Sequence, residues 1–107
     1  MTHSVTKLVY AYVEQRIKDE TLIWPNTTED AILFAQTEIA EAVEILFARK
    51  EYIRNHPDDK PDWSAGAFGE ELGDAIFMLM VAGYMMGCDP IDSMISKWRN
   101  DARADPK

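Results

Sequence analysis

The sequence has one cysteine, two histidines and few basic residues, and each shortage excludes a class of protein. Cys88 has no second cysteine for an intrachain disulfide, so we expect a reducing, cytoplasmic environment. Only 11 Lys and Arg stand against 19 Asp and Glu, and the formal net charge is -8 at pH 7. Broad electrostatic binding to nucleic acid or an anionic membrane is therefore not expected, because such binding depends on Lys and Arg.

The sequence also lacks an apolar run long enough to cross a bilayer. The longest run covers residues 75–88, whereas a transmembrane helix needs about 20 apolar residues. Residues 1–10 lack the apolar region of a signal peptide. The run at 75–88 therefore predicts a buried helix rather than a membrane span.

What the sequence does contain predicts one all-α domain over residues 1–107, with a four-helix bundle-like fold and no strands. Its 107 residues, 47% of them hydrophobic, are enough for one modest core. We expect helices over about 5–19, 28–54, 64–87 and from 90 onward. The predicted caps and end signals are Thr27 or Thr28 before the second helix, Ser64 and Gly87 around the third, and Asp89-Pro90 before the fourth.

The second and third helices have wider apolar surfaces than one neighbour can cover. Ile32, Ile39, Leu46 and Ile53 recur at intervals of seven in the second helix. A second strip, made of Leu33, Ala40 and Phe47, lies beside this stripe, and the third helix is apolar nearly all round. Helices of this kind need more than one partner, so we expect a homodimer or homotetramer.

Two pairs of carboxylates stand out within these apolar helices. Glu38 and Glu41 are three residues apart on the second helix, and Glu71 and Asp74 are three apart on the third. Residues at this spacing lie side by side on a helix, so each pair forms one acidic patch. Taken alone, either pair is a common feature of a solvated surface.

Apolar neighbours favour a metal site over a solvated surface. Phe34 and Ile45 lie beside the first pair, and Met78 follows the second on the same strip. Carboxylates next to a core are costly to ionise unless they are paired with a cation. All-oxygen ligands suit Mg²⁺, with Mn²⁺ as a substitute, whereas a di-iron bundle needs Glu-x-x-His motifs that His3 and His56 do not provide.

Order and spacing of these motifs resemble the MazG-type all-α nucleoside triphosphate pyrophosphohydrolases. Glu38-x-x-Glu41 is followed after about thirty residues by Glu71-x-x-Asp74 on the next helix. Many members have Glu-Glu-x-x-Glu in the first motif, where this sequence has Thr37. Further matching features are Glu70-Glu71-Leu72-Gly73-Asp74, the turn Gly87-Cys88-Asp89-Pro90, Lys97 and Pro106.

The resemblance implies hydrolysis of a (d)NTP between the α and β phosphates, giving a monophosphate and pyrophosphate, for house-cleaning of the nucleotide pool. It implies that Glu38, Glu41, Glu71 and Asp74 hold Mg²⁺, and that Glu38 or Glu41 activates a water. Its members tend to be dimers or dimers of dimers.

Two further residues are candidates for substrate binding. Trp24 can stack on a base, although a tryptophan before a helix also serves as a hydrophobic staple. Lys97 can contact a phosphate, although a cation near a helix C-terminus is favoured by the helix dipole alone. The alternative to an enzyme is a non-catalytic acidic helical module that binds a protein partner through its surplus apolar faces.

Overall fold

The computed structural model describes residues 3–19, 25, 27–59, 61 and 63–104, and the described residues form α-helices without any strand. This confirms the all-α prediction. The helices are α1 (Ser4–Lys18), α2 (Thr28–Asn55), α3 (Trp63–Met86) and α4 (Pro90–Ala104).

The start of α2 and the end of α3 lie where the sequence predicts them. The Thr27 hydroxyl accepts a hydrogen bond from the backbone N–H of Asp30 at 3.1 Å and so caps α2. Gly87 follows α3 with a φ of 74°, and the N–H of Cys88 donates to the carbonyl of Gly83 at 3.0 Å. This left-handed turn is a common way to end a helix, and it favours glycine because glycine has no Cβ.

Ser64 does not cap α3, contrary to the prediction. It lies inside the first turn, 4% exposed, and its hydroxyl donates to the carbonyl of Pro61 at 2.7 Å. The helix begins one residue earlier than expected, so the Ser64 side chain faces the preceding segment instead of the free N–H groups of the first turn.

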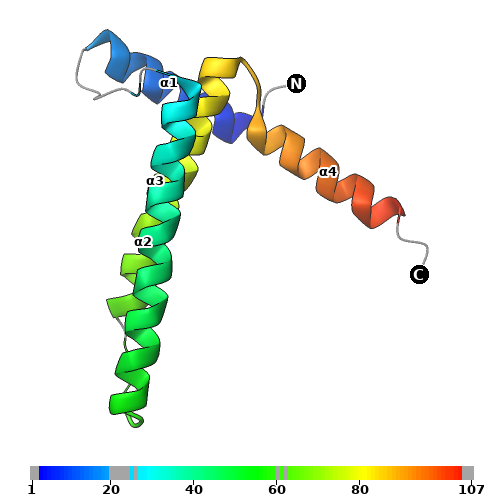
Figure 1. The fold of residues 1–107 in the computed structure, drawn as a ribbon. Coiled ribbons are helices and arrows are strands. Elements are labelled where there is room, and N and C mark those ends of the chain that lie inside the picture. Colours follow the sequence, from blue (N-terminus) through cyan, green and yellow to red (C-terminus); the bar gives the residue numbers. More distant parts are fainter. Residues whose placement is uncertain (1–2, 20–24, 26, 60, 62, 105–107) are drawn as a thin grey trace.

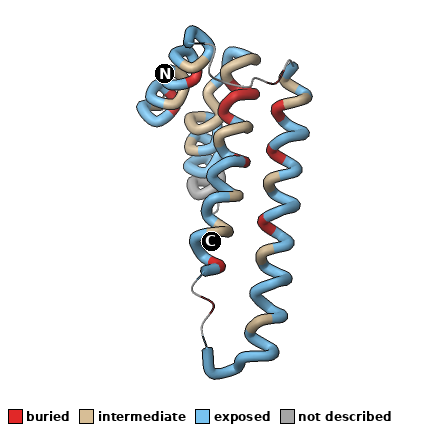
Figure 2. Tube along the Cα trace, turned by 90° about the vertical axis from the view of Figure 1, so that its left-hand side faces the viewer, coloured by how far each residue is buried: buried red, intermediate tan, exposed pale blue. Residues whose placement is uncertain are grey.

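The four helices do not close into a bundle within one chain. Helices α2 and α3 form a long antiparallel hairpin, and α1 contacts α3 but not α2 (Figure 1). Figure 2 shows α1, α3 and α2 side by side in that order. Helix α4 leaves the end of α3 at 101° and extends away from the hairpin (Figure 1).

Small residues make the contact between α2 and α3. Ala31, Ala35 and Ala42 of α2 are at most 2% exposed, whereas Ile32, Ile39 and Leu46 remain 38–45% exposed. The alanines let the two backbones approach closely, which turns the isoleucine stripe to the side of the hairpin. Most of the hairpin surface is therefore exposed (Figure 2). The buried hydrophobic residues are Val13, Ala31, Ala35, Ala42, Ala75, Met80, Val81 and Ala82.

Among the described residues, no single helix is long and apolar enough to cross a membrane. Helices α3 and α4 reach the required length and composition only as a pair, and the axis bends by 101° between them.

Candidate functional site

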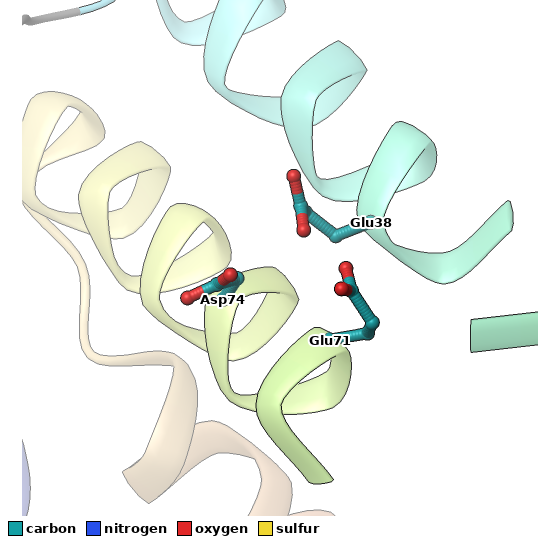
Figure 3. Close-up of side chains that lie close together, drawn as sticks. All are labelled: Glu38, Glu71 and Asp74. Atoms are coloured by element: carbon teal, nitrogen blue, oxygen red, sulfur yellow. The ribbon is translucent and has the colours of Figure 1, made fainter. Parts of the chain in front are cut away.

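The antiparallel hairpin brings acids from α2 and α3 together. Each of Glu38, Glu71 and Asp74 offers a carboxylate oxygen that lies within 4.8 Å of those of the other two. Figure 3 shows Glu38 reaching from α2 toward Glu71 and Asp74 of α3. The two acids of α3 share a face because they are one helical turn apart, and α2 passes α3 at the level of Glu38.

Glu71 of this group has one buried carboxylate oxygen. Its Oε2 atom is buried and accepts no hydrogen bond, although the side chain as a whole is only half-buried. Among the described residues, no Lys or Arg forms an ion pair with Glu38, Glu41, Glu71 or Asp74. A buried carboxylate oxygen without a donor or a cation is costly, so this atom needs a further partner.

Glu41 lies beside the group on α2. A hydrogen bond shared with Glu71, together with the negative charges of Glu71 and Asp74, raises the pKa of Glu41 above its ordinary value. Two carboxyl groups share a hydrogen bond only when one of them holds a proton. Glu41 is therefore less readily ionised than an isolated glutamate when no cation is present.

Neighbouring groups shift the pKa of Glu71 in opposite directions. The hydrogen bond from Glu41 lowers the pKa of Glu71, but the hydrogen bond to Glu38, desolvation and the charges of Glu38 and Asp74 raise it. The net effect is a raised pKa. Four carboxylates so arranged cannot all be negative without strong mutual repulsion, and either protons or a divalent cation relieve it.

An apolar cavity opens next to these acids. Its volume is about 270 Å³, and Glu38 and Asp74 form part of its wall. Phe77 follows Asp74 by three residues and therefore shares its face of α3, a spacing in the sequence that identifies it as a neighbour of the acids. The remaining lining is apolar: Pro25, Phe34, Phe77 and Met78.

The two predicted substrate-binding residues are not among the residues that the structure brings together here. Trp24 lies outside the described residues. Lys97 is exposed on α4, and α4 contacts α1 and α3 but not α2. Thr37, which replaces a glutamate of the family motif, is exposed and donates its hydroxyl to the carbonyl of Leu33 at 3.1 Å. Among the residues that the structure describes, the site therefore consists of acids and an apolar cavity.

Comparisons with protein families, with curated proteins and with solved structures find no match for this chain. The likeness to MazG-type enzymes therefore rests on its sequence motifs.

Proposed function

We propose that this chain is a magnesium-dependent nucleoside triphosphate pyrophosphohydrolase with a MazG-like fold, cleaving a (d)NTP to a (d)NMP and pyrophosphate. One observation gives the main support for this proposal. The buried Oε2 of Glu71 has no hydrogen-bond partner, although carboxylates of α2 and α3 lie around it. A buried carboxylate oxygen needs a donor, a shared proton or a cation, and the surrounding oxygen ligands support a cation.

The donor set fits a hard divalent cation. Glu38, Glu71 and Asp74 would hold it through oxygen atoms, with Glu41 beside them, and no sulfur or nitrogen ligand takes part. Mg²⁺, or Mn²⁺ in its place, would neutralise phosphate charge and lower the pKa of a bound water.

Residues of the chain itself would bind the nucleoside and accept the proton of the attacking water. The apolar wall made by Phe34, Phe77 and Met78 offers a surface for the nucleoside part of the substrate, and it keeps water from one side of the acids. Glu38 or Glu41 accepts the proton of the attacking water at a carboxylate oxygen.

Release of pyrophosphate from a panel of NTPs and dNTPs, with Mg²⁺ present and absent, tests this proposal. We expect magnesium-dependent release from at least one substrate, and deoxynucleotides are the first choice for a pool-cleaning enzyme of the cytoplasm. Activity that is absent with every substrate, for protein shown to be folded, would contradict the proposal.

The second candidate function is the non-catalytic acidic module, and the exposed apolar residues of α2 and α3 are the observation that favours it. Thermal unfolding separates the two candidates without a substrate. A cation that binds the native state raises the melting temperature, whereas a module without a metal site does not respond to Mg²⁺.

A further inference from the structure

A second cavity lies between the end of α2 and the start of α3, and its volume is about 530 Å³. Sites for small molecules typically measure roughly 300–1,000 Å³ and have mostly apolar walls with a few polar groups. This cavity shares no lining residue with the acidic site or with the cavity beside it. The apolar part of its wall is formed by Leu46, Ile53, Pro61, Ala65 and Phe68.

Arg49 contributes a positive charge to this wall. It follows Ala35 and Ala42 at intervals of seven, so it lies on the strip of α2 that faces α3. The two alanines are buried in the contact between the helices, whereas Arg49 is exposed. Among the residues that the structure describes, no acid forms an ion pair with Arg49. The guanidinium group therefore has N–H donors available for a carboxylate, whose planar shape it matches.

Asp59 contributes a negative charge to the same wall. Its Oδ2 atom accepts a hydrogen bond from the hydroxyl of Tyr52, which fixes the position of the carboxylate. No described residue donates to its Oδ1 atom, and none of the described basic residues forms an ion pair with it. Ser64 also lines the cavity, but its hydroxyl already donates to the carbonyl of Pro61. The cavity therefore offers one cationic group and one anionic group that do not pair with each other.

We propose that this cavity binds a small zwitterion with an apolar body, the chemical class of an apolar amino acid. The carboxylate of the ligand binds the guanidinium group of Arg49, and its ammonium group binds Oδ1 of Asp59. The apolar body packs against Leu46, Ile53 and Phe68. A simple anion would face the charge of Asp59 without a cation of its own, and a simple cation would face the charge of Arg49. Only a ligand with both charges complements both groups.

Three related molecules test the proposal on the wild-type protein. L-Phenylalanine, 3-phenylpropionate and phenethylamine have the same phenyl ring, but 3-phenylpropionate lacks the ammonium group and phenethylamine lacks the carboxylate. In NMR titrations, L-phenylalanine should move the amide signals of the residues that line the cavity. Its dissociation constant should be at least roughly 10-fold lower than that of either analogue, because each analogue loses one hydrogen bond between charged groups. The titration needs neither metal nor nucleotide, so its outcome is independent of the proposed function.

Two variants assign the charged groups to their partners. Arg49→Gln should weaken binding of L-phenylalanine and 3-phenylpropionate roughly 10-fold and should not weaken that of phenethylamine. Asp59→Asn should weaken L-phenylalanine and phenethylamine and should not weaken 3-phenylpropionate. Arg54→Gln is the matched control, because Arg54 pairs with Glu51 at 3.4 Å and does not line the cavity; it should bind all three molecules as the wild type does. Arg49 and Asp59 are both exposed, and the same spectra show whether each variant is folded.

Three results would overturn the proposal. The first is a wild-type spectrum that does not change with L-phenylalanine at millimolar concentration, which is also the result expected if a second copy of the chain fills the cavity. The second is wild-type protein that binds 3-phenylpropionate or phenethylamine as tightly as L-phenylalanine, because one of the two charged groups then takes no part. The third is an equal loss of binding in Arg49→Gln and Arg54→Gln, which would place the ligand elsewhere.

Discussion

The hydroxyl of Thr6 donates a hydrogen bond to the carboxylate of Asp89, which joins the first turn of α1 to the start of α4. The same carboxylate accepts hydrogen bonds from the backbone N–H groups of His3 and Asp92. Thr6 is fully buried, so its hydroxyl has no access to water in place of this bond. One side chain therefore caps α4 and fixes α1 against the end of the hairpin.

The first prediction concerns the contribution of Asp89 to stability at different pH values. Partial desolvation opposes its charged form, but the hydrogen bonds from Thr6, Asp92 and His3 outweigh it and lower the pKa to about 2 from 3.8. The native state binds the proton less tightly than the unfolded state, so the stabilisation is complete above about pH 4 and is lost as the pH falls through about 2.

Asp89→Asn should therefore lower the free energy of unfolding at pH 7, and the difference from wild type should shrink between pH 4 and pH 2. Urea unfolding at a series of pH values measures this. Asp58→Asn, in the exposed loop after α2, is the control and should change little. A difference that stays constant down to pH 2 would contradict the role of the Asp89 charge.

The second prediction concerns the close approach of Gly83 to its neighbours. A Cβ atom at Gly83 would lie 2.6 Å from Cγ of Pro90 and 2.7 Å from the hydroxyl of Tyr10. Gly83→Ala should therefore destabilise the protein by about 1–3 kcal/mol, because α1 and α4 must shift to make room. Gly66→Ala is the matched control: no atom lies within 4 Å of its Cβ position, so alanine in this helix should stabilise by about 0.5–1 kcal/mol. Chemical denaturation of both variants checks the opposite signs.

Local features of the sequence were enough to predict the helices and some of their caps. Thr27 and Asp89 act through hydrogen bonds to residues three positions later, so their neighbours along the chain define their role. The prediction that Ser64 caps α3 was wrong. Ser and Thr favour helix starts in general, but here the start of the helix depended on the preceding segment, whose Pro61 carbonyl accepts the hydrogen bond of the Ser64 hydroxyl. The spacing of Glu71 and Asp74 also predicted that these two carboxylates of α3 lie together.

Which face of a helix is covered could not be predicted from spacing alone. Isoleucines at intervals of seven, such as Ile32 and Ile39, have the pattern of a core stripe, yet in the single chain the core side of α2 is formed by Ala31 and Ala35. Both strips are apolar, and the choice between them depends on how closely α3 approaches. That distance is a tertiary property, as is the direction of α4, which keeps Lys97 away from α2 in the single chain.

The third prediction concerns the response of stability to Mg²⁺. A cation at ten times its dissociation constant stabilises the native state by about 1.4 kcal/mol, which raises the melting temperature of a domain of this size by roughly 6 °C. Glu71→Gln should abolish most of this increase in melting temperature. The amide supplies one neutral oxygen in place of the charged carboxylate whose buried Oε2 lacks a partner, so it binds the cation more weakly. Differential scanning calorimetry with and without Mg²⁺ measures both effects. An unchanged response in Glu71→Gln would exclude this residue as a ligand.

The last prediction concerns mechanism and follows from the raised pKa of Glu41. A hydrogen bond shared with Glu71 and the surrounding negative charges make ionisation of Glu41 unfavourable in the metal-free native state. The native state then holds the Glu41 proton more tightly than the unfolded state does. The contribution of Glu41 to the stability of the metal-free protein should therefore fall as the pH rises through and above 4.5, the ordinary pKa of glutamate.

Glu41→Gln removes this titration and keeps a side chain of the same shape. Without Mg²⁺ at pH 7, the variant should be at least as stable as wild type, whereas its rate of pyrophosphate release should fall by roughly 10²–10⁴-fold, the usual contribution of a general base. Glu44→Gln is the matched control, because Glu44 is exposed on the same helix one turn further on; it should retain both activity and stability. Measuring unfolding and turnover on the same preparations separates loss of chemistry from loss of fold. A stable Glu41→Gln variant with wild-type turnover would exclude Glu41 from catalysis, and one that is markedly less stable than wild type without metal would show that its carboxylate serves the fold.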